Sequence, residues 1–342
     1  MIHQKVNSMK ITWEKAEELR SDFLYKVVKP LLPNAKYKFT LQHGDYTNTS
    51  NNFSGVISDD DIFNGSIYGY TGKNKFIHFT TLQSLEAILL SGFIRMSDFT
   101  SLTDRSELEY ASSVLNDYLT RNGEKERIEN EKKSLFCLSF CESTQNTIRD
   151  TFMWNEYGAK GSGVIIDFSI SEFNANRFSI GKIRYGSDAL KDIIDLKNRA
   201  LEFLKETNFY HASLVNLLAI VLSYHKSVKY KNEKELRLLF NDKELNFSAP
   251  KNRYYTMDSA ISNRNEIYNY NKIFLKGRDC LVSSNPRLFP EIKINRVILG
   301  YNLSLEQKEE VISHLNSLKN KLGNLNFKIS CLNNDLELLD KR

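Results

Sequence analysis

The chain has 342 residues, of which 41% are hydrophobic, 12% aromatic and 26% charged. This length and composition allow one large domain or two smaller ones with a substantial core. The 47 basic and 42 acidic residues give a net charge of +5, a mild excess that permits contact with nucleic acid without arguing for it. No apolar run of about eighteen residues occurs, so we expect no membrane span. The polar N-terminus and the four scattered cysteines lead us to expect a cytoplasmic protein.

Residues 1–74 are expected to form an N-terminal helix followed by an irregular extension. Residues 12–32 carry apolar side chains at helical spacing, and Pro30 and Pro33 mark the end of this helix. The stretch that follows is polar and rich in turn residues, which favours loop or irregular strand. We therefore expect the compact α+β domain to span residues 75–342.

Residues 75–97 read as strand, helix and strand. Thr80 and Thr81 supply N-cap oxygens, apolar residues then recur at helical spacing, and Ser91-Gly92 ends the helix. The first strand places the lone His78 between Ile77 and Phe79. A histidine at a strand end either binds a ligand or has a structural role, in which it caps the strand or fills the core.

The remaining elements follow in chain order. The pattern predicts a helix, two strands around a short helix, a further strand, a long helical region broken near Thr207, a strand and a loop-rich section to residue 285. The chain then ends in a strand–helix–strand unit in which Ser304 and Gln307 form a capping box. The predicted ranges are 104–122, 134–141, 148–157, 163–168, 182–185, 189–227, 235–240, 294–299, 304–322 and 325–331.

Cys137 and Cys141 lie on a predicted strand with Ser139 between them. Period-two alternation puts all three side chains on one face. A CxxxC spacing on a strand without a second cysteine pair is not typical of zinc sites, so we interpret these cysteines as packed thiols and expect no metal site.

Three further clusters contain candidate site residues. Thr103, Asp104 and Glu107 lead into a helix, where an N-cap is the simpler interpretation. Trp154 and Tyr157 share one helical face ahead of a glycine loop that would let backbone approach a ligand, although such an aromatic pair is commonly core.

The last cluster, 230–240, is a predicted strand with two distinct faces. Leu236, Leu238 and Phe240 face the core, and the opposite face carries Glu233, Glu235 and Arg237. This pattern is either an exposed strand with an Arg–Glu pair or an E-x-E site that stabilises positive charge on a sugar ring.

In their order, these clusters resemble a large bacterial family of unknown function whose members carry H-[YF]-T-S, N-D-x-x-E, C-F-S, M-W-x-x-Y, W-x-x-E-x-E-x-R and I-L-G motifs. Thr103 stands here in place of the usual Asn, and Tyr230 in place of Trp. The resemblance covers residues 75–318. The matching stations are His78-Phe79-Thr80-Thr81, Thr103-Asp104 with Glu107, Cys137-Leu138-Ser139, Met153-Trp154 with Tyr157, Lys226 with Tyr230, Glu233, Glu235 and Arg237, and Val297-Ile298-Leu299-Gly300.

The opening H-F-T block also looks like the first motif of the histidine–tyrosine–glutamate class of ADP-ribosyltransferases. This resemblance implies an α+β fold with a mixed or antiparallel split sheet flanked by helices, and NAD as substrate. It implies that His78 bonds a ribose hydroxyl of NAD and that Glu235 binds the 2′-hydroxyl of the nicotinamide ribose and stabilises an oxocarbenium ion. Glu233 or Glu235 would take the acceptor's proton. The other residues expected at the NAD site are Phe79, Thr80, Ser139, Trp154, Tyr157 and Arg237.

The middle residue of that catalytic triad stays open. Tyr157 or Tyr110 would stack on nicotinamide, or Ser139 would support Glu235 as in the arginine–serine–glutamate class. Phe79 replaces the glycine that often follows the histidine.

Three functions are therefore weighed. The first is an ADP-ribosyltransferase, as an effector in bacterial conflict or antiphage defence, acting on a protein, a nucleic acid or a small molecule. The second is a binding or sensor module that keeps the fold without turnover. The third is a metal-dependent nuclease that uses Asp104, Asp167, Glu233 and Glu235.

Overall fold

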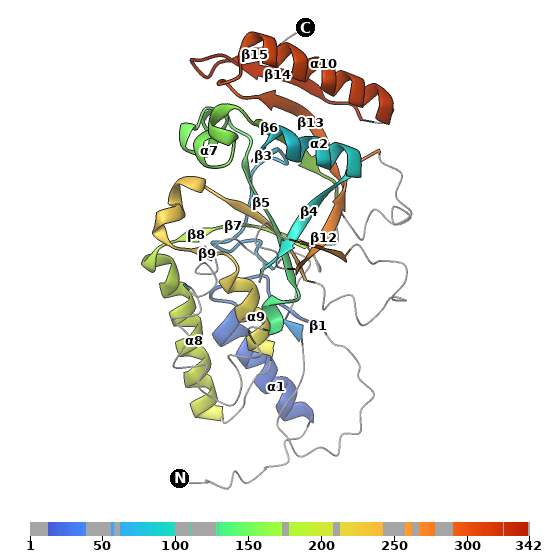
Figure 1. Cartoon of the computed structure of the whole chain (residues 1–342). Helices are drawn as coiled ribbons and strands as arrows, with labels where there is room; N and C mark the ends of the chain where they lie inside the picture. The colour runs from blue at the N-terminus through green and yellow to red at the C-terminus, as the bar shows by residue number, and fades with distance from the viewer. Residues whose placement is uncertain are drawn as a thin grey trace. The chain divides into compact units, whose positions relative to one another are not determined.

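Figure 1 shows the computed structural model of the chain. The chain divides into two compact units that alternate along the sequence. The helical unit comprises Met1–Gly69, Asp104–Lys133 and Arg184–Val228, and the sheet unit comprises Tyr70–Thr103, Ser134–Ile183 and Lys229–Arg342. The predicted division into residues 1–74 and 75–342 stays a prediction. The structure describes residues 13–38, 56–57, 62–99, 110, 128, 130–172, 178–207, 213–241, 257–261, 267–277, 290–323 and 325–340.

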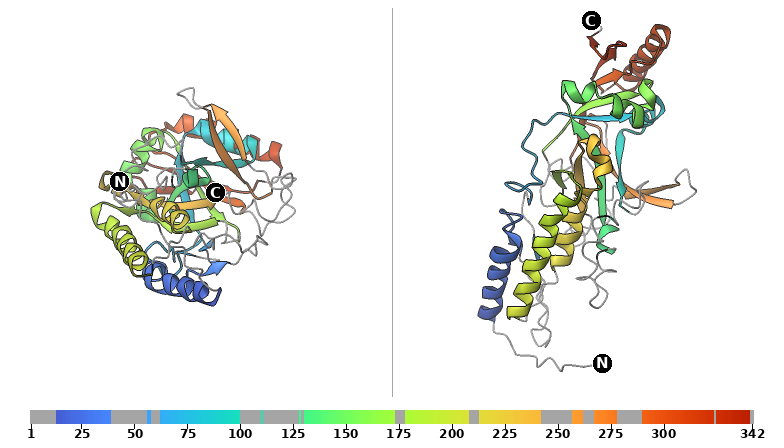
Figure 2. Two further views of the ribbon diagram at one scale, coloured as in Figure 1. Left: turned by 90° about the horizontal axis from the view of Figure 1, so that it is seen from below. Right: turned by 90° about the vertical axis from the view of Figure 1, so that its left-hand side faces the viewer.

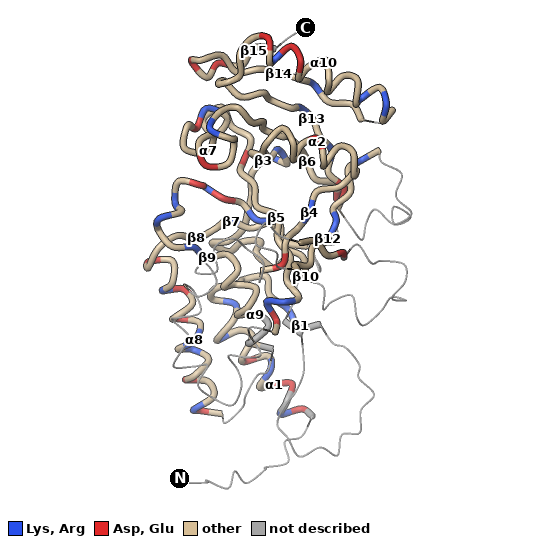
Figure 3. The backbone as a smooth tube through the Cα atoms, viewed as in Figure 1, with Lys and Arg blue, Asp and Glu red and all other residues tan. Residues whose placement is uncertain are grey.

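In the helical unit, α1 and α8 run side by side (Figures 1 and 2). Phe23 of α1 and Phe203 of α8 form an edge-to-face pair with ring centroids 5.4 Å apart. Acidic and basic residues mix along α8, whose apolar stripe is buried (Figure 3). The predicted break near Thr207 is confirmed, because α8 ends there. The elements are α1 (Trp13–Phe23), the π-helix η1 (Leu24–Val28), β1 (Tyr37–Lys38), β2 (Val56–Ile57), β8 (Arg184–Tyr185), α8 (Ser187–Thr207), α9 (Ser213–Leu222) and β9 (His225–Lys226).

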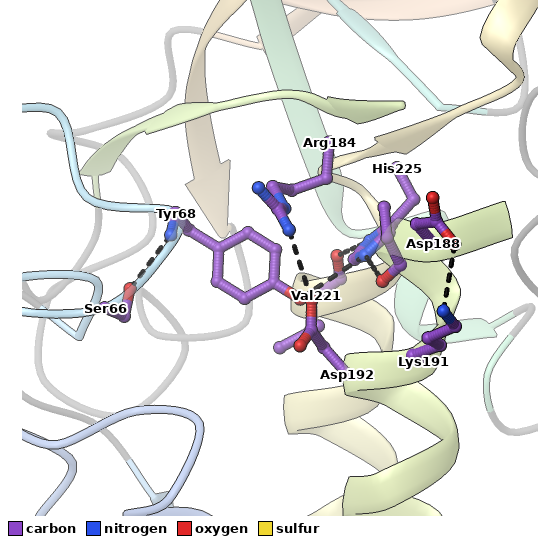
Figure 4. A network of polar contacts seen from close by, with 9 residues as sticks. Ser66, Tyr68, Arg184, Asp188, Lys191, Asp192, Val221 and His225 are labelled. Carbon is purple, nitrogen blue, oxygen red and sulfur yellow. Dashed lines mark hydrogen bonds and ion pairs between the residues drawn. The ribbon is translucent and has the colours of Figure 1, made fainter. Parts of the chain in front are cut away.

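A buried histidine links the ends of α8 and α9 in this unit (Figure 4). The Nδ1 atom of His225 lies 3.0 Å from the carbonyl oxygen of Val221, and its Nε2 atom lies 3.2 Å from that of Ala189. The Tyr68 hydroxyl lies 3.4 Å from the same Nε2. Burial lowers the pKa of His225 to about 4, so the ring is neutral at neutral pH.

The sheet unit is built on one mixed sheet. Its main strand order is β11-β12-β4-β5-β3-β6-β13-β14-β15, and β10 joins β5 to β7. The pair β13–β14 is parallel, whereas the other pairs of this sheet are antiparallel. The strands are β3 (Phe76–Thr80), β4 (Phe93–Asp98), β5 (Leu135–Glu142), β6 (Val164–Ile170), β7 (Phe178–Lys182), β10 (Leu236–Asn241), β11 (Met257–Ile261), β12 (Ile267–Phe274), β13 (Ile292–Leu299), β14 (Lys328–Leu332) and β15 (Leu338–Asp340).

Helices flank both faces of this sheet. Buried leucines of α2 (Leu82–Ser91) and α10 (Leu305–Leu322) pack on one face with the apolar side chains of β6 and β13. On the other face, Met153 and Trp154 of α7 (Thr151–Glu156) belong to a second core. The predicted mixed α+β architecture with flanking helices is therefore confirmed.

The sheet splits along one edge of β5. Strand β3 pairs with Cys141 and Glu142, whereas β4 pairs with Phe136 and Cys137. At one end of this edge, Leu135 C=O accepts from the N–H of Phe99, the residue after β4. At the other end, the N–H of Ser143, the residue after β5, donates to the carbonyl oxygen of Lys75, the residue before β3. The backbone groups of the odd-numbered residues of β5 therefore face the edge that β3 and β4 share. Between these two ladders, no described strand pairs with this edge, and Ser139 lies at the split.

Two predicted regions need correction. The section to residue 285, expected to be rich in loops, contains β11 and β12, and β15 follows the last predicted strand. The predicted helix over 104–122 lies outside the described residues except for position 110. In the part of the chain that the structure describes, no helix combines the length and apolar character needed to cross a membrane.

Candidate functional site

His78 bonds the backbone of β5 at the split. If the β3–β5 ladder continued beyond Ile77, Ser139 would pair with Phe79. Instead the Nδ1–H group of His78 donates to the Ser139 carbonyl oxygen at 3.0 Å, which satisfies a backbone acceptor that the ladder leaves open. This bond fixes the tautomer, so that Nε2 carries a lone pair. Burial lowers the pKa of His78, which keeps the imidazole neutral at neutral pH.

A buried ion pair lies on the face of the sheet that carries the Ser139 side chain. Oε1 of Glu235 accepts hydrogen bonds from Ser139 Oγ at 2.5 Å and from Arg237 Nε at 2.9 Å, and lies 2.8 Å from Arg237 Nη2. The side chains of Arg237 and Glu235 are 2% and 4% exposed. The Arg237 guanidinium also lies over the Phe99 ring, 5.2 Å from its centroid. Two positively polarised partners thus hold the Glu235 carboxylate in one orientation.

The strand register explains why these side chains meet. Ser139 of β5 stands opposite Arg237 of β10, so both project from the same face. Leu236, Leu238 and Phe240 project from the other face into the core, as the sequence predicts. The interpretation of Glu235 and Arg237 as an exposed strand face is wrong, because both are buried.

Tyr157 and Glu233 form a second pair, joined by a hydrogen bond, and Glu233 lies two residues before Glu235 in the sequence. Glu233 is not on the strand, because it ends the 3₁₀ helix η4 (Val228–Glu233). The Tyr157 hydroxyl donates to Glu233 Oε1, and Cys141 Sγ donates to the Glu233 carbonyl oxygen at 3.2 Å. Burial and the bond to Glu233 raise the pKa of Tyr157, so its phenol stays protonated. Tyr157 is nevertheless 44% exposed.

Lys234 lies between Glu233 and Glu235 in the sequence and has an unusual backbone conformation. Its φ of 47° lies in the left-handed region, which disfavours a residue other than glycine. Its ammonium group lies 3.3 Å from Asp150 Oδ2, and Asp150 Oδ1 caps α7 by accepting from Phe152 and Met153 N–H. Neither Lys234 nor Asp150 was among the predicted site residues. Lysine carries no signal for this conformation, although an Asp directly before a short helix is a typical cap.

Three predicted site residues, Phe79, Thr80 and Trp154, have structural contacts. Trp154 is fully buried, its indole N–H donates to Ile148 O at 2.8 Å, and its ring meets Phe79 edge-to-face at 5.2 Å. Thr80 ends β3, and a Cβ at Gly163 would lie 2.4 Å from its carbonyl oxygen. This glycine therefore serves close packing between strands rather than contact with a ligand.

Cys137, Cys141 and Cys331 are buried and form no disulfide with one another, and the first two were expected to be packed thiols. Burial raises the pKa values of Cys137 and Cys141 to about 12. Among the described residues, no three His, Cys, Asp or Glu side chains are grouped to hold a metal ion. Asp167, one of the four carboxylates considered for a nuclease, pairs instead with Arg296 at 3.1 Å. Asp104 lies outside the described residues.

Similarity to a known protein family covers one part of this site. Residues 153–238 match DUF2971, a family described as "Protein of unknown function". The predicted resemblance to a family of unknown function is thereby confirmed for this segment. The DUF2971 segment contains Tyr157, Glu233, Glu235 and Arg237, whereas His78 and Ser139 precede it. No curated protein and no solved structure matches the chain.

Proposed function

We propose that this protein cleaves the bond between nicotinamide and ribose in NAD and transfers ADP-ribose to an acceptor. The observation that carries the proposal is the chain of contacts from His78 through Ser139 to Glu235 and Arg237 at the split of the sheet. Three separate strands contribute to it. The resemblance of the opening H-F-T block to the first motif of the ADP-ribosyltransferases also supports the proposal.

Each end of this chain of contacts suits one part of NAD. The neutral His78 presents an acceptor at Nε2, and a ribose hydroxyl is a donor of the matching kind. Glu235 is held by Ser139 and Arg237, so it would carry a fixed negative charge toward the ribose. Such a charge stabilises the oxocarbenium ion that develops when the nicotinamide bond breaks. The partly exposed Tyr157 ring would stack on nicotinamide.

The proposed transfer is a substitution at ribose C1′ that needs no metal ion and no oxidant or reductant. The bond from ribose C1′ to nicotinamide breaks, and nicotinamide leaves as a neutral ring with the bonding electron pair. A nucleophilic oxygen or nitrogen of the acceptor bonds to C1′, and its proton goes to a carboxylate, for which Glu233 is the candidate. Tyr157 would orient Glu233 through its hydroxyl.

The test is nicotinamide release from NAD, measured by chromatography. We expect release by the wild type and its loss in His78→Ala. Ser139→Ala removes one hydrogen bond to a charged group, worth about 1.5–3 kcal/mol, and should slow release about 10- to 100-fold. The matched controls are His314→Ala, an exposed histidine, and Ser169→Ala, a strand serine; both should behave as wild type.

A second candidate is a binding module that holds NAD or a related nucleotide without turnover. The observation that favours it is the ion pair itself, because Arg237 already compensates the charge of Glu235. Calorimetry with NAD separates the two functions. Saturable binding that depends on His78, with no nicotinamide released, would support the module and contradict the transferase.

A further inference from the structure

One face of the β4–β12 pair is built from aromatic and cationic side chains. Alternate residues of these strands, Ile94, Met96 and Ile273, are buried in the core on the opposite face. The positions between them project away from that core. On this face Arg95 is exposed, Tyr270 is buried, and the other side chains are partly exposed. The aromatic–cationic face consists of Phe93, Arg95, Tyr268, Tyr270, Lys272 and Phe274.

The cations lie against the rings. The Arg95 guanidinium carbon is 4.5 Å from the centroid of the Tyr270 ring, and its Nη1 donates to the Tyr268 hydroxyl at 2.9 Å. Lys272 stands opposite Arg95 in the register, and its Nζ is 5.2 Å from the centroid of the Phe93 ring. Basic positions are visible on both strands in Figure 3. Positive charge and aromatic surface are therefore interleaved on one strand pair.

This face continues into the candidate site on the same side of the sheet. Tyr270 stands opposite Ser97, and Ser97 stands opposite Cys137. Cys137 shares its face of β5 with Ser139, whose partner in the register is Arg237. Side chains at directly opposed positions project from one face, so the aromatic–cationic face and the buried ion pair share one side of one sheet.

We infer that the aromatic–cationic face binds single-stranded nucleic acid. Unpaired bases stack on aromatic rings, while arginine and lysine neutralise the phosphates that follow. A duplex hides the faces of its bases, so the rings favour a single strand. The assignment of this strand as the acceptor of ADP-ribose rests on the proposed function. In that reaction an amino nitrogen of a base or a sugar hydroxyl oxygen bonds to C1′ as nicotinamide leaves, and the proton that this nitrogen or oxygen loses passes to Glu233.

A neighbouring carboxylate opposes this binding. Asp258 on β11 lies 2.9 Å from Lys272 Nζ, and its Oδ2 also accepts from the Tyr270 hydroxyl at 3.2 Å. It therefore competes with a phosphate for Lys272. Asp258→Asn should free that charge and tighten binding of the strand, a gain that a face without a role in binding would not show.

The experiment is fluorescence anisotropy of a labelled twelve-nucleotide single strand with the full chain, without NAD. We expect Tyr268→Ala to weaken binding about tenfold, whereas Tyr268→Phe keeps the ring and stays near wild type. Arg95→Gln should weaken binding and make the salt dependence shallower by about 0.7 in logarithmic slope. Lys293→Gln removes an exposed lysine of β13 and serves as the matched control.

The outcomes separate this inference from the proposed function. Absence of binding, equal binding of the duplex, or equal losses in Lys293→Gln and Arg95→Gln would overturn it, even if the protein releases nicotinamide. Conversely, binding that follows the Tyr268 and Arg95 variants would stand even if NAD is never cleaved. Failure of NAD cleavage would then remove the acceptor role and leave the binding surface.

Discussion

The buried pair of Glu235 and Arg237 makes a sharp prediction about stability. Replacing Glu235 with Gln keeps an oxygen that accepts from Ser139 and Arg237, yet removes the negative charge. The Arg237 side chain is 2% exposed, so its charge would stay buried without compensation. Breaking a buried pair in this way costs about 3–5 kcal/mol. We expect the lower end of that range, because the hydrogen bonds persist.

A double-mutant cycle measures the interaction itself. Arg237→Met should also destabilise the protein, because it leaves the buried Glu235 carboxylate without the positive charge of Arg237. The double variant removes both charges and should cost less than the two single changes together by about 2 kcal/mol or more. Urea denaturation followed by circular dichroism gives the free energies of unfolding.

An exposed pair of the same chain provides the control. Lys15 and Glu18 lie 2.8 Å apart on α1, with side chains 54% and 61% exposed. Glu18→Gln makes the same chemical change and should cost less than about 1 kcal/mol. Additive effects of Glu235→Gln and Arg237→Met, within about 0.5 kcal/mol, would refute the reasoning, since independent sites add and coupled ones do not.

Three other expectations follow from buried groups. The thiols of Cys137 and Cys141, with pKa values raised to about 12, should resist iodoacetamide at pH 8 in the folded protein and react in urea, as mass spectrometry would detect. Burial lowers the pKa of His225 to about 4, so only the unfolded chain takes up this proton as the pH falls from about 6.5 toward 4. His225 should lower the free energy of unfolding by about 3 kcal/mol over that window, a contribution that His225→Gln removes and His314→Gln retains, while the smaller dependence due to His78 stays in both variants. Gly300→Ala would place a Cβ 2.1 Å from a backbone carbonyl oxygen, and its thermal unfolding midpoint should fall by several degrees; an unchanged midpoint would contradict this packing.

The alternation of residues along one strand predicted part of the candidate site. Alternation along β10 separates Leu236 and Leu238 from Glu235 and Arg237, and the structure keeps that separation. The expected support of Glu235 by Ser139 has a direct counterpart in the 2.5 Å hydrogen bond between them. The separation along β10 depends on residue spacing, which a sequence expresses well, whereas the Ser139–Glu235 contact was implied by the resemblance to the ADP-ribosyltransferases.

Other features depend on distant contacts that no local pattern encodes. The burial of Glu235 depends on residues that are distant in the sequence, such as Ser139, and that lie on the same face of the sheet. Strand β12 reads I-Y-N-Y-N-K-I-F, in which Tyr270 and Asn271 are both buried whereas Ile267 is exposed, so the usual apolar alternation is absent. The left-handed backbone of Lys234 is held by its surroundings, including Asp150, and lysine gives no hint of it.

The most direct test of the central claim is the amount of nicotinamide that the wild type releases from NAD, compared with Ser139→Ala, in the presence of a single-stranded oligonucleotide. The account predicts release above the uncatalysed rate and a loss of about 10- to 100-fold in the variant, with both proteins equally folded. Absence of release, or equal release by the two proteins, would contradict the claim that the contacts from His78 to Glu235 act on NAD.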